Sequence, residues 1–447
     1  MSIVSMQCSL RRVLPKNYTA VNSVASRYFS SSSQSNGAEV RRAVLENGVT
    51  IIAGPKSNDT LASAGVFVKA GSAYENHSTH GCAHYLRRFL YKSTNRVSGL
   101  RITRSIETVT ASFAAENTPE SLMYRALFQH EHLGTALALM GDVLRPRLAE
   151  WEFRDVRNLV KYDVNERKSN KEDRVLDAVR HTAFGGVGLG RSPLCPEHNI
   201  NEIYPEHVAE YTLGRVVGSN ITVVGNVRDH EKFQEAVANA FGALPKDPEV
   251  SIDAPETSPY VGGTTLVCDG PGSAYVEAYS TGSSNPKAAF AQQILAEILG
   301  FYTPHNVSPS DRVSSRLGKS LVGSNVSQAR TFLMNDSQQL FGIQAFGNTP
   351  CRDLAESVHK QLTSLADNIS EEEFNTAMNI VSVRNRLRND RREVLLGTVA
   401  RVDENTAKEF GGEVTASDVR DVAKKLLESK PTIYASGDLA QLPKFAF

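Results

Sequence analysis

Three residues of one predicted helix have the spacing of a zinc-dependent hydrolase motif but not its chemistry. In the pattern H-x-x-E-H, two histidines bind zinc and the glutamate activates a water molecule. Here His84 stands at the first position, while Arg87 and Arg88 stand where the glutamate and the second histidine would be. Offsets of three and four residues place all three side chains on one face of a helix.

The two arginines make metal binding at this position unfavourable. A guanidinium has no acceptor lone pair and keeps its proton in proteins, so it neither binds zinc nor takes a proton from water. Each guanidinium about 4 Å from a divalent ion would also cost roughly 8 kcal/mol at an effective dielectric of about 20. We therefore expect no catalytic, metal-binding or cofactor-binding residue and no cofactor. Buried arginines need carboxylates, and the candidates are Asp163, Glu166 and Glu107.

Other groups of polar residues favour structural roles. His77 and His80, upstream of the motif, lack an acid that would complete a metal shell, and we expect them in a loop. The segment 130–132 (His-Glu-His) is typical of a solvated surface. The glycine-rich stretch 185–190 lacks the GxxxxGK[ST] pattern of a phosphate-binding loop. The arginine run in 384–392 is interrupted by acids, which favours a solvated or interface helix over nucleic-acid binding.

The elements that would position these residues form two similar halves. Asn47-Gly48 between two apolar runs predicts a β-hairpin. In both halves strands precede helices, and Glu152-Phe153 and Glu373-Phe374 begin long helices at similar distances from the preceding strand. We expect a duplicated α+β domain. The predicted strands are 43–45, 49–52, 64–68, 121–126, 264–268, 274–279 and 340–343, and the predicted helices begin near 81 or cover 133–140, 151–169 and 288–299.

Composition limits the class of protein. The chain has 447 residues, 49 basic and 49 acidic side chains and 40% hydrophobic residues, which suits a globular protein of more than one domain. Its five cysteines are scattered without a CxxC pair, so we expect reduced thiols. Residues 1–38 contain no acid, four basic residues and ten serines. This composition predicts a mitochondrial transit peptide, with a cut after Phe29 and trimming toward Gly37, which leaves a mature chain of charge 45 − 49 = −4.

Several segments in a fixed order resemble the mitochondrial processing peptidase and its relatives among the pitrilysin-type inverted zincins. The resemblance covers about residues 40–445. The matching segments are Gly71-Ser72, Glu75, Gly81, Ala83-His84, Lys92-Ser93-Thr94, Ile106-Glu107, Ala115-Glu116-Asn117, Leu189 to Leu194, Ile203 to Val208 with Tyr211, and Val223 to His230. A catalytic member of this family would keep all three motif residues and a distal acidic ligand on the long helix over 151–169. Asp163 and Glu166 are the candidates for the matching position.

The departures from the family pattern imply a non-catalytic branch. The non-catalytic processing-peptidase subunit carries a glycine-rich loop, whereas residues 301–318 here contain Ser and Pro but no glycine cluster. The chain therefore looks most like the core protein 2 branch of ubiquinol–cytochrome c reductase, respiratory complex III. The alternative is a non-catalytic, presequence-binding subunit of a mitochondrial processing peptidase.

The resemblance implies a fold, a location and partners. We expect two homologous domains, each a mostly antiparallel sheet with helices on one face, arranged as a half-clam. The predicted division is 1–36 transit peptide, 37–245 N-terminal domain, 246–262 linker and 263–447 C-terminal domain. An inactive peptidase homologue of this branch would be peripheral to the mitochondrial inner membrane on the matrix side. Its implied partners are core protein 1, cytochrome b, cytochrome c1, the Rieske iron–sulfur subunit and small subunits of a dimeric complex III, with no nucleic acid.

Overall fold

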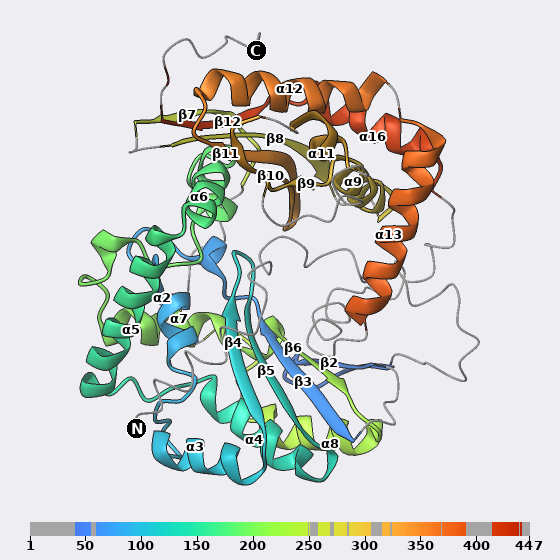
Figure 1. The fold of residues 1–447 in the computed structure, drawn as a ribbon. Helices are drawn as coiled ribbons and strands as arrows, with labels where there is room; N and C mark the ends of the chain where they lie inside the picture. The colour runs from blue at the N-terminus through green and yellow to red at the C-terminus, as the bar shows by residue number, and fades with distance from the viewer. Residues whose placement is uncertain are drawn as a thin grey trace.

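The structure is a computed structural model in which two six-stranded sheets each carry a layer of helices (Figure 1). It describes residues 41–54, 60–248, 250, 258–268, 272–283, 286–304, 315–321, 324–367, 369–389, 414–437 and 439. The predicted transit peptide, the cut after Phe29 and part of the predicted linker lie outside these residues.

The first sheet has the strand order β1-β2-β6-β3-β5-β4. Strands β2 and β6 are parallel, and the other neighbours are antiparallel. The hairpin expected at Asn47-Gly48 joins β1 to β2, and Gly48 has the positive φ of 88° that such a turn favours. The strands are β1 (Arg41–Val44), β2 (Thr50–Ala53), β3 (Leu61–Val68), β4 (Ser112–Asn117), β5 (Leu122–Gln129) and β6 (Ile221–Asn226).

Alternate side chains of β3 show which face of this sheet is covered by helices. Ala62, Ala64, Val66 and Val68 are buried in one cluster with apolar residues of α4 and α8. Because side chains of a strand alternate between faces, this set lies on a single face. The helices of this half are α2 (Cys82–Arg88), α3 (Gly99–Thr108), α4 (Leu133–Val143), α5 (Glu150–Ser169), α6 (Lys171–Ala183), α7 (Pro205–Arg215) and α8 (His230–Phe241).

Five neighbouring strands of the second sheet repeat the topology of five strands of the first, and each sheet has one further edge strand without a counterpart in the other. The order of the second sheet is β7-β12-β8-β11-β10-β9, again with one parallel pair, β12 and β7, beside antiparallel strands. This correspondence agrees with the predicted duplication. Its elements are β7 (Gly263–Val267), β8 (Ser273–Ser283), β9 (Phe301–Tyr302), β10 (Val326–Asn335), β11 (Gln338–Gly347), β12 (Thr432–Ser436), α9 (Pro286–Leu299), α11 (Arg316–Leu321), α12 (Cys351–Asp367), α13 (Glu371–Asn389) and α16 (Ala416–Glu428).

Helix α6 belongs to the first half in sequence but packs on the second sheet. Tyr275 and Tyr279 of β8 face the helices of their own half, in a cluster with residues of α9, α12 and α16. The alternate β8 residues Ala274, Val276 and Ala278 are buried against α6 from the opposite face. In Figure 1, α6 accordingly lies between the two lobes. The sequence does not predict this packing, because the apolar stripe of a helix does not say which sheet it covers.

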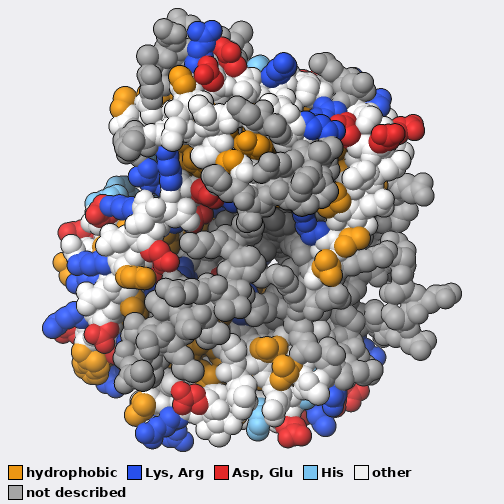
Figure 2. All heavy atoms as spheres, in the orientation of Figure 1, with side chains coloured by type: hydrophobic (Ala, Val, Ile, Leu, Met, Phe, Trp, Pro, Cys, Tyr) orange, Lys and Arg blue, Asp and Glu red, His pale blue; other side chains and the backbone are white. Residues whose placement is uncertain are grey.

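Polar contacts between the turn of the β10–β11 hairpin and the first half add to this packing. The guanidinium of Arg180 on α6 lies 3.5 Å from the carboxylate of Asp336. The backbone N–H of Ser337 donates to Glu120 at 2.8 Å. Both halves are therefore joined through α6 on one face of the second sheet and through this hairpin turn. Figure 2 shows basic and acidic side chains spread over the described surface of both lobes.

Candidate functional site

The buried carboxyl group of Glu75 lies at the start of helix α2, which carries the predicted motif. Glu75 accepts hydrogen bonds from the backbone N–H groups of Gly81 at 3.0 Å and of Ala83 at 2.7 Å. It thereby satisfies N–H groups that the start of a helix leaves unpaired. Burial raises the pKa of Glu75 to about 7, although these two hydrogen bonds act in the opposite direction. Gly81 has φ +117°, and a Cβ there would lie 2.5 Å from Sγ of Cys195, so the position favours glycine.

Aromatic packing sets α2 against the long helix α5. The rings of Tyr85 on α2 and Phe153 on α5 stack with centroids 4.9 Å apart, and Phe89 packs on the same Phe153 ring. All three side chains are buried in the first core cluster. This contact brings the motif face of α2 toward the middle of α5, where Asp163 lies.

His84 is completely buried, and both of its ring nitrogens are hydrogen-bonded. The backbone N–H of Cys195 lies 3.2 Å from Nδ1, which must therefore be the acceptor. A neutral imidazole then carries its proton on Nε2, which donates to Oδ2 of Asp163 at 2.9 Å. Burial lowers the pKa of His84, although the bond to Asp163 opposes the shift. Both positions from which His84 could bind a metal are thus in use.

The carboxylate of Asp163 is shared between His84 and Arg88. Nε of Arg88 donates to Oδ2 at 2.5 Å and Nη2 donates to Oδ1, so the pair is bidentate. The Asp163 side chain is only 6% exposed. Burial alone would raise its pKa, but hydrogen bonds from His84 and Arg88 and the charge of Arg88 outweigh burial and lower the pKa of Asp163 to about 2. The carboxylate is therefore ionised and engaged by a permanent cation.

Arg87 completes the cluster at the edge of the first sheet. Its Nη1 donates to Oδ1 of Asn117 at 3.2 Å, and its Nη2 lies 3.8 Å from Oδ2 of Asp163. The prediction that both arginines pair with carboxylates is confirmed, with Asp163 as the shared partner. The other two candidate acids, Glu166 and Glu107, are exposed.

The donor set does not suit zinc. Zinc needs deprotonated ligands with free lone pairs, whereas here the histidine is hydrogen-bonded at both nitrogens and the nearest carboxylate is bound to a guanidinium. Throughout the residues that the structure describes, no group of three or more His, Cys, Asp or Glu side chains could hold a metal ion. The geometry is that of an ion-paired and hydrogen-bonded cluster that fixes α2 to α5.

The remaining candidate residues take structural places. His80 lies 3.4 Å from the carbonyl of Ser192, and burial lowers its pKa to about 4; His77 is exposed. Residues 130–132 form the short 3-10 helix η3 at the surface. Within the glycine-rich stretch, Gly188–Gly190 forms the 3-10 helix η4. Arg384 on α13 pairs with Glu297. Arg391 and Arg392 lie outside the described residues.

The cysteines and the described helices add two observations. Cys82, Cys195, Cys268 and Cys351 are free thiols, as expected, and Cys8 lies outside the described residues. None of the helices in the described part of the chain is both long and apolar enough to cross a membrane.

Comparison with known proteins agrees with this fold. Residues 51–197, about a third of the chain, match the family described as Insulinase (Peptidase family M16). The chain has the fold of a protease from Helicobacter pylori, with a TM-score of 0.79 and 18% identity over 90% of this chain and 100% of that one. These findings support a relationship with the M16 peptidases, and the motif residues and Asp163 all lie within the matched segment.

Full-length relatives are named as subunits of one mitochondrial enzyme. The chain is 26% identical to mitochondrial-processing peptidase subunit alpha-2 of Dictyostelium discoideum, over 97% of both chains. It is 25% identical to a probable subunit beta of Arabidopsis thaliana, over 91% of this chain and 80% of the relative. Subunit beta of Bos taurus is 24% identical, over 92% of this chain and 86% of the relative.

Proposed function

We propose that this chain is a non-catalytic, peptide-binding subunit of a mitochondrial processing peptidase. In this role it would hold a presequence or support a catalytic partner, without hydrolysing a bond itself. The observation that carries the proposal is the His84–Arg88–Asp163 cluster, which stands where an M16 hydrolase would keep its metal and its water-activating acid.

The chemistry of the cluster supports a chain that does not catalyse hydrolysis, because none of its residues can replace the zinc ion or the general base. A general base must be able to accept a proton, but Arg87 and Arg88 are permanent cations. Asp163 has a pKa of about 2, and both of its oxygens accept hydrogen bonds from His84 and Arg88, so it is a weak base at neutral pH. His84 has no free nitrogen with which to act.

The relatives support the choice of complex. Processing-peptidase subunits align with the chain along most of its length, and their names support a mitochondrial location. The acid-free, basic first 38 residues favour the same location.

A core subunit of respiratory complex III is the rival role. The sequence favours it through the absence of glycine clustering in residues 301–318. Its partners would be core protein 1, cytochrome b, cytochrome c1 and the Rieske iron–sulfur subunit, at the matrix side of the inner membrane. The relatives carry processing-peptidase names, which support the processing-peptidase role better.

Isolation of the intact complex distinguishes the two roles. Tagged chain is purified from mitochondria in mild detergent, separated on a native gel, and assayed for cleavage of a presequence peptide and for cytochrome b haem. We expect presequence cleavage to co-migrate with the chain, and we expect the chain separated from its partners to bind the peptide without cleaving it. Co-migration with cytochrome b and no processing activity would overturn the proposal in favour of complex III, and cleavage by the isolated chain would overturn its non-catalytic character.

A further inference from the structure

The two most exposed large apolar side chains among the residues that the structure describes lie in neighbouring segments of the first half. Leu100, near the start of α3, and Trp151, near the start of α5, are each 65% exposed. Trp151 is also the only tryptophan in the chain. Single exposed apolar residues are common on protein surfaces, so the surroundings of these two side chains decide whether they have a function.

Ser93 holds together the segments that carry these side chains. Its hydroxyl donates to the carboxylate of Glu152 on α5 at 2.8 Å and accepts from the N–H of Gly99, the first residue of α3, at 3.0 Å. Its carbonyl accepts from the N–H of Arg147 at 2.9 Å. The start of α3, the loop 145–148 and the start of α5 therefore meet at one corner of the first half.

Two arginines share the exposed face of α3 with Leu100. Ile102 and Ile106 of this helix are buried in the core. Arg101 and Arg104 lie on the opposite face of the helix, and both are exposed. Arg104 follows Leu100 by four residues, so the two side chains are neighbours on the helix surface.

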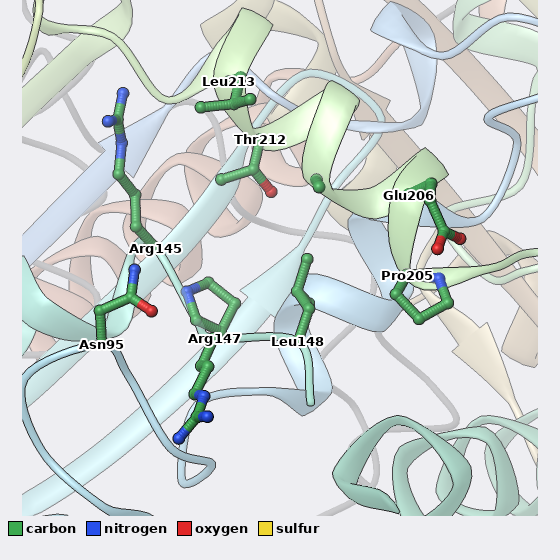
Figure 3. A pocket seen from close by; sticks show the side chains of 10 residues that line it. Asn95, Arg145, Arg147, Leu148, Pro205, Glu206, Thr212 and Leu213 are labelled. Atoms are coloured by element: carbon green, nitrogen blue, oxygen red, sulfur yellow. The ribbon is translucent and has the colours of Figure 1, made fainter. Parts of the chain in front are cut away.

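Arg96 and Arg147 extend this positive surface beyond α3. Arg96 is 81% exposed, although its Nη1 lies 3.3 Å from Oδ1 of Asp142. Arg147 is exposed, and Figure 3 shows its guanidinium pointing away from the cavity between the loop 145–148 and α7. Both guanidinium groups are therefore accessible from solvent.

These side chains form one surface, which we call the corner patch. Exposed acids in the same segments are Glu107 and Glu150, and Glu150 pairs with Arg154 at 3.8 Å. The arginines of the patch outnumber these acids, so positive charge predominates. In Figure 2, basic and hydrophobic side chains occur together along the lower left edge, where Figure 1 places α3 and α5. The corner patch consists of Arg96, Leu100, Arg101, Arg104, Arg147 and Trp151.

We propose that the corner patch docks on a membrane surface that contains anionic lipids. The guanidinium groups would contact lipid phosphates, and Leu100 and Trp151 would enter the layer at the level of the headgroups, where tryptophan is favoured. An anionic membrane matches both the charge of the patch and its two apolar side chains, whereas a nucleic acid matches chiefly the charge. The patch contains no member of the His84–Arg88–Asp163 cluster, so this contact is independent of the proposed peptide-binding role.

The single tryptophan makes vesicle binding directly measurable. The chain beginning at Gly37 is used, because the four basic residues before it would themselves attract anionic lipid. It is mixed with vesicles of phosphatidylcholine, alone or with an equal part of phosphatidylglycerol. With phosphatidylglycerol only, we expect the emission of Trp151 to move to shorter wavelength and to be quenched by lipids with brominated acyl chains. Both effects should disappear at high salt, which screens the arginines.

Two variants with the same loss of charge identify the surface that binds. The control positions are exposed and lie on α12 and α16, at the opposite end of the molecule from α3 in Figure 1. Each arginine near an anionic surface contributes about fivefold to binding, so the patch variant should bind at least about thirtyfold more weakly. The control variant should stay within about twofold of the parent chain. The patch variant carries Arg101→Gln, Arg104→Gln and Arg147→Gln, and the control variant carries Arg352→Gln, Lys424→Gln and Lys425→Gln.

The apolar part of the patch has its own test. Leu100→Gln keeps every charge and should weaken vesicle binding about threefold or more. Circular dichroism shows that each variant is folded. No emission shift with phosphatidylglycerol vesicles, equal weakening in the patch and control variants, or unchanged binding of Leu100→Gln would overturn the proposal. A Trp151 response to single-stranded RNA but not to vesicles would overturn it in favour of a nucleic-acid surface.

Discussion

Removing the guanidinium of Arg88 should destabilise the N-terminal half more than removing any exposed arginine nearby. In Arg88→Met, the carboxylate of Asp163 stays buried at 6% exposure without its bidentate partner. The pKa of Asp163 is about 2 instead of 3.8, and a shift of this size corresponds to about 2 kcal/mol. Breaking a buried pair costs about 3–5 kcal/mol. Because Arg88 is 22% exposed and His84 remains, we expect a loss of about 2–3 kcal/mol.

Urea unfolding followed by far-UV circular dichroism measures this loss, and α5, the helix that carries Asp163, offers a control. Arg154 on α5 pairs with Glu150 at 3.8 Å, but both side chains are more than three-quarters exposed. Arg154→Met should therefore cost less than about 0.5 kcal/mol. A double-mutant cycle with Asp163→Asn should give a coupling energy of at least about 1.5 kcal/mol between positions 88 and 163. A cost for Arg88→Met equal to that of the control, or a coupling below about 0.5 kcal/mol, would refute the reasoning.

Three further predictions concern the same part of the chain. The pKa of Asp163 is depressed to about 2. The ionised side chain therefore contributes about 2 kcal/mol to the free energy of unfolding above pH 4, and this contribution is lost as the pH falls toward 2. Urea unfolding at a series of acid pH values should show this loss in the wild type and not in Asp163→Asn. The pKa of Glu75 is raised from 4.5 to about 7, so this group should lower stability by roughly 3 kcal/mol as the pH rises from 4.5 to 7. That slope should vanish in Glu75→Gln, and its persistence there would contradict the assignment. Gly81→Ala should cost at least about 2 kcal/mol in urea unfolding, because the new Cβ meets Cys195 and φ is +117°; a neutral result would show that the loop adjusts freely.

Local patterns in the sequence predicted several of the elements because their causes are local, but strands such as β4 and β10 were not predicted. Asn47-Gly48 supplies the turn between β1 and β2, and the acidic start and periodic apolar positions of 150–169 produce α5. The duplication is also visible, since five strands of each half follow one another in the same order with helices between them. The prediction that the motif does not bind zinc follows from the residue types alone, because no geometry turns a guanidinium into a zinc ligand.

Features that depend on tertiary contacts could not be predicted in the same way. The choice of Asp163 over Glu166 as partner depends on the rotation of α5 against α2, which the stacking of Tyr85 on Phe153 fixes. The bond from the Cys195 N–H to His84 joins residues 111 positions apart, and backbone donors leave no trace in a sequence pattern. Glu75 belongs to the segments that carry the family resemblance, but the sequence gives no separate signal for its place at the start of α2.

Zinc content tests the central claim most directly. The mature chain is purified without chelator, equilibrated with excess zinc, desalted and analysed by inductively coupled plasma mass spectrometry, in parallel with His84→Asn. Because His84 and Asp163 are engaged by Cys195 and Arg88, we predict far less than one zinc ion per chain and no difference between the two proteins. One zinc ion per wild-type chain that is lost in His84→Asn would contradict the account.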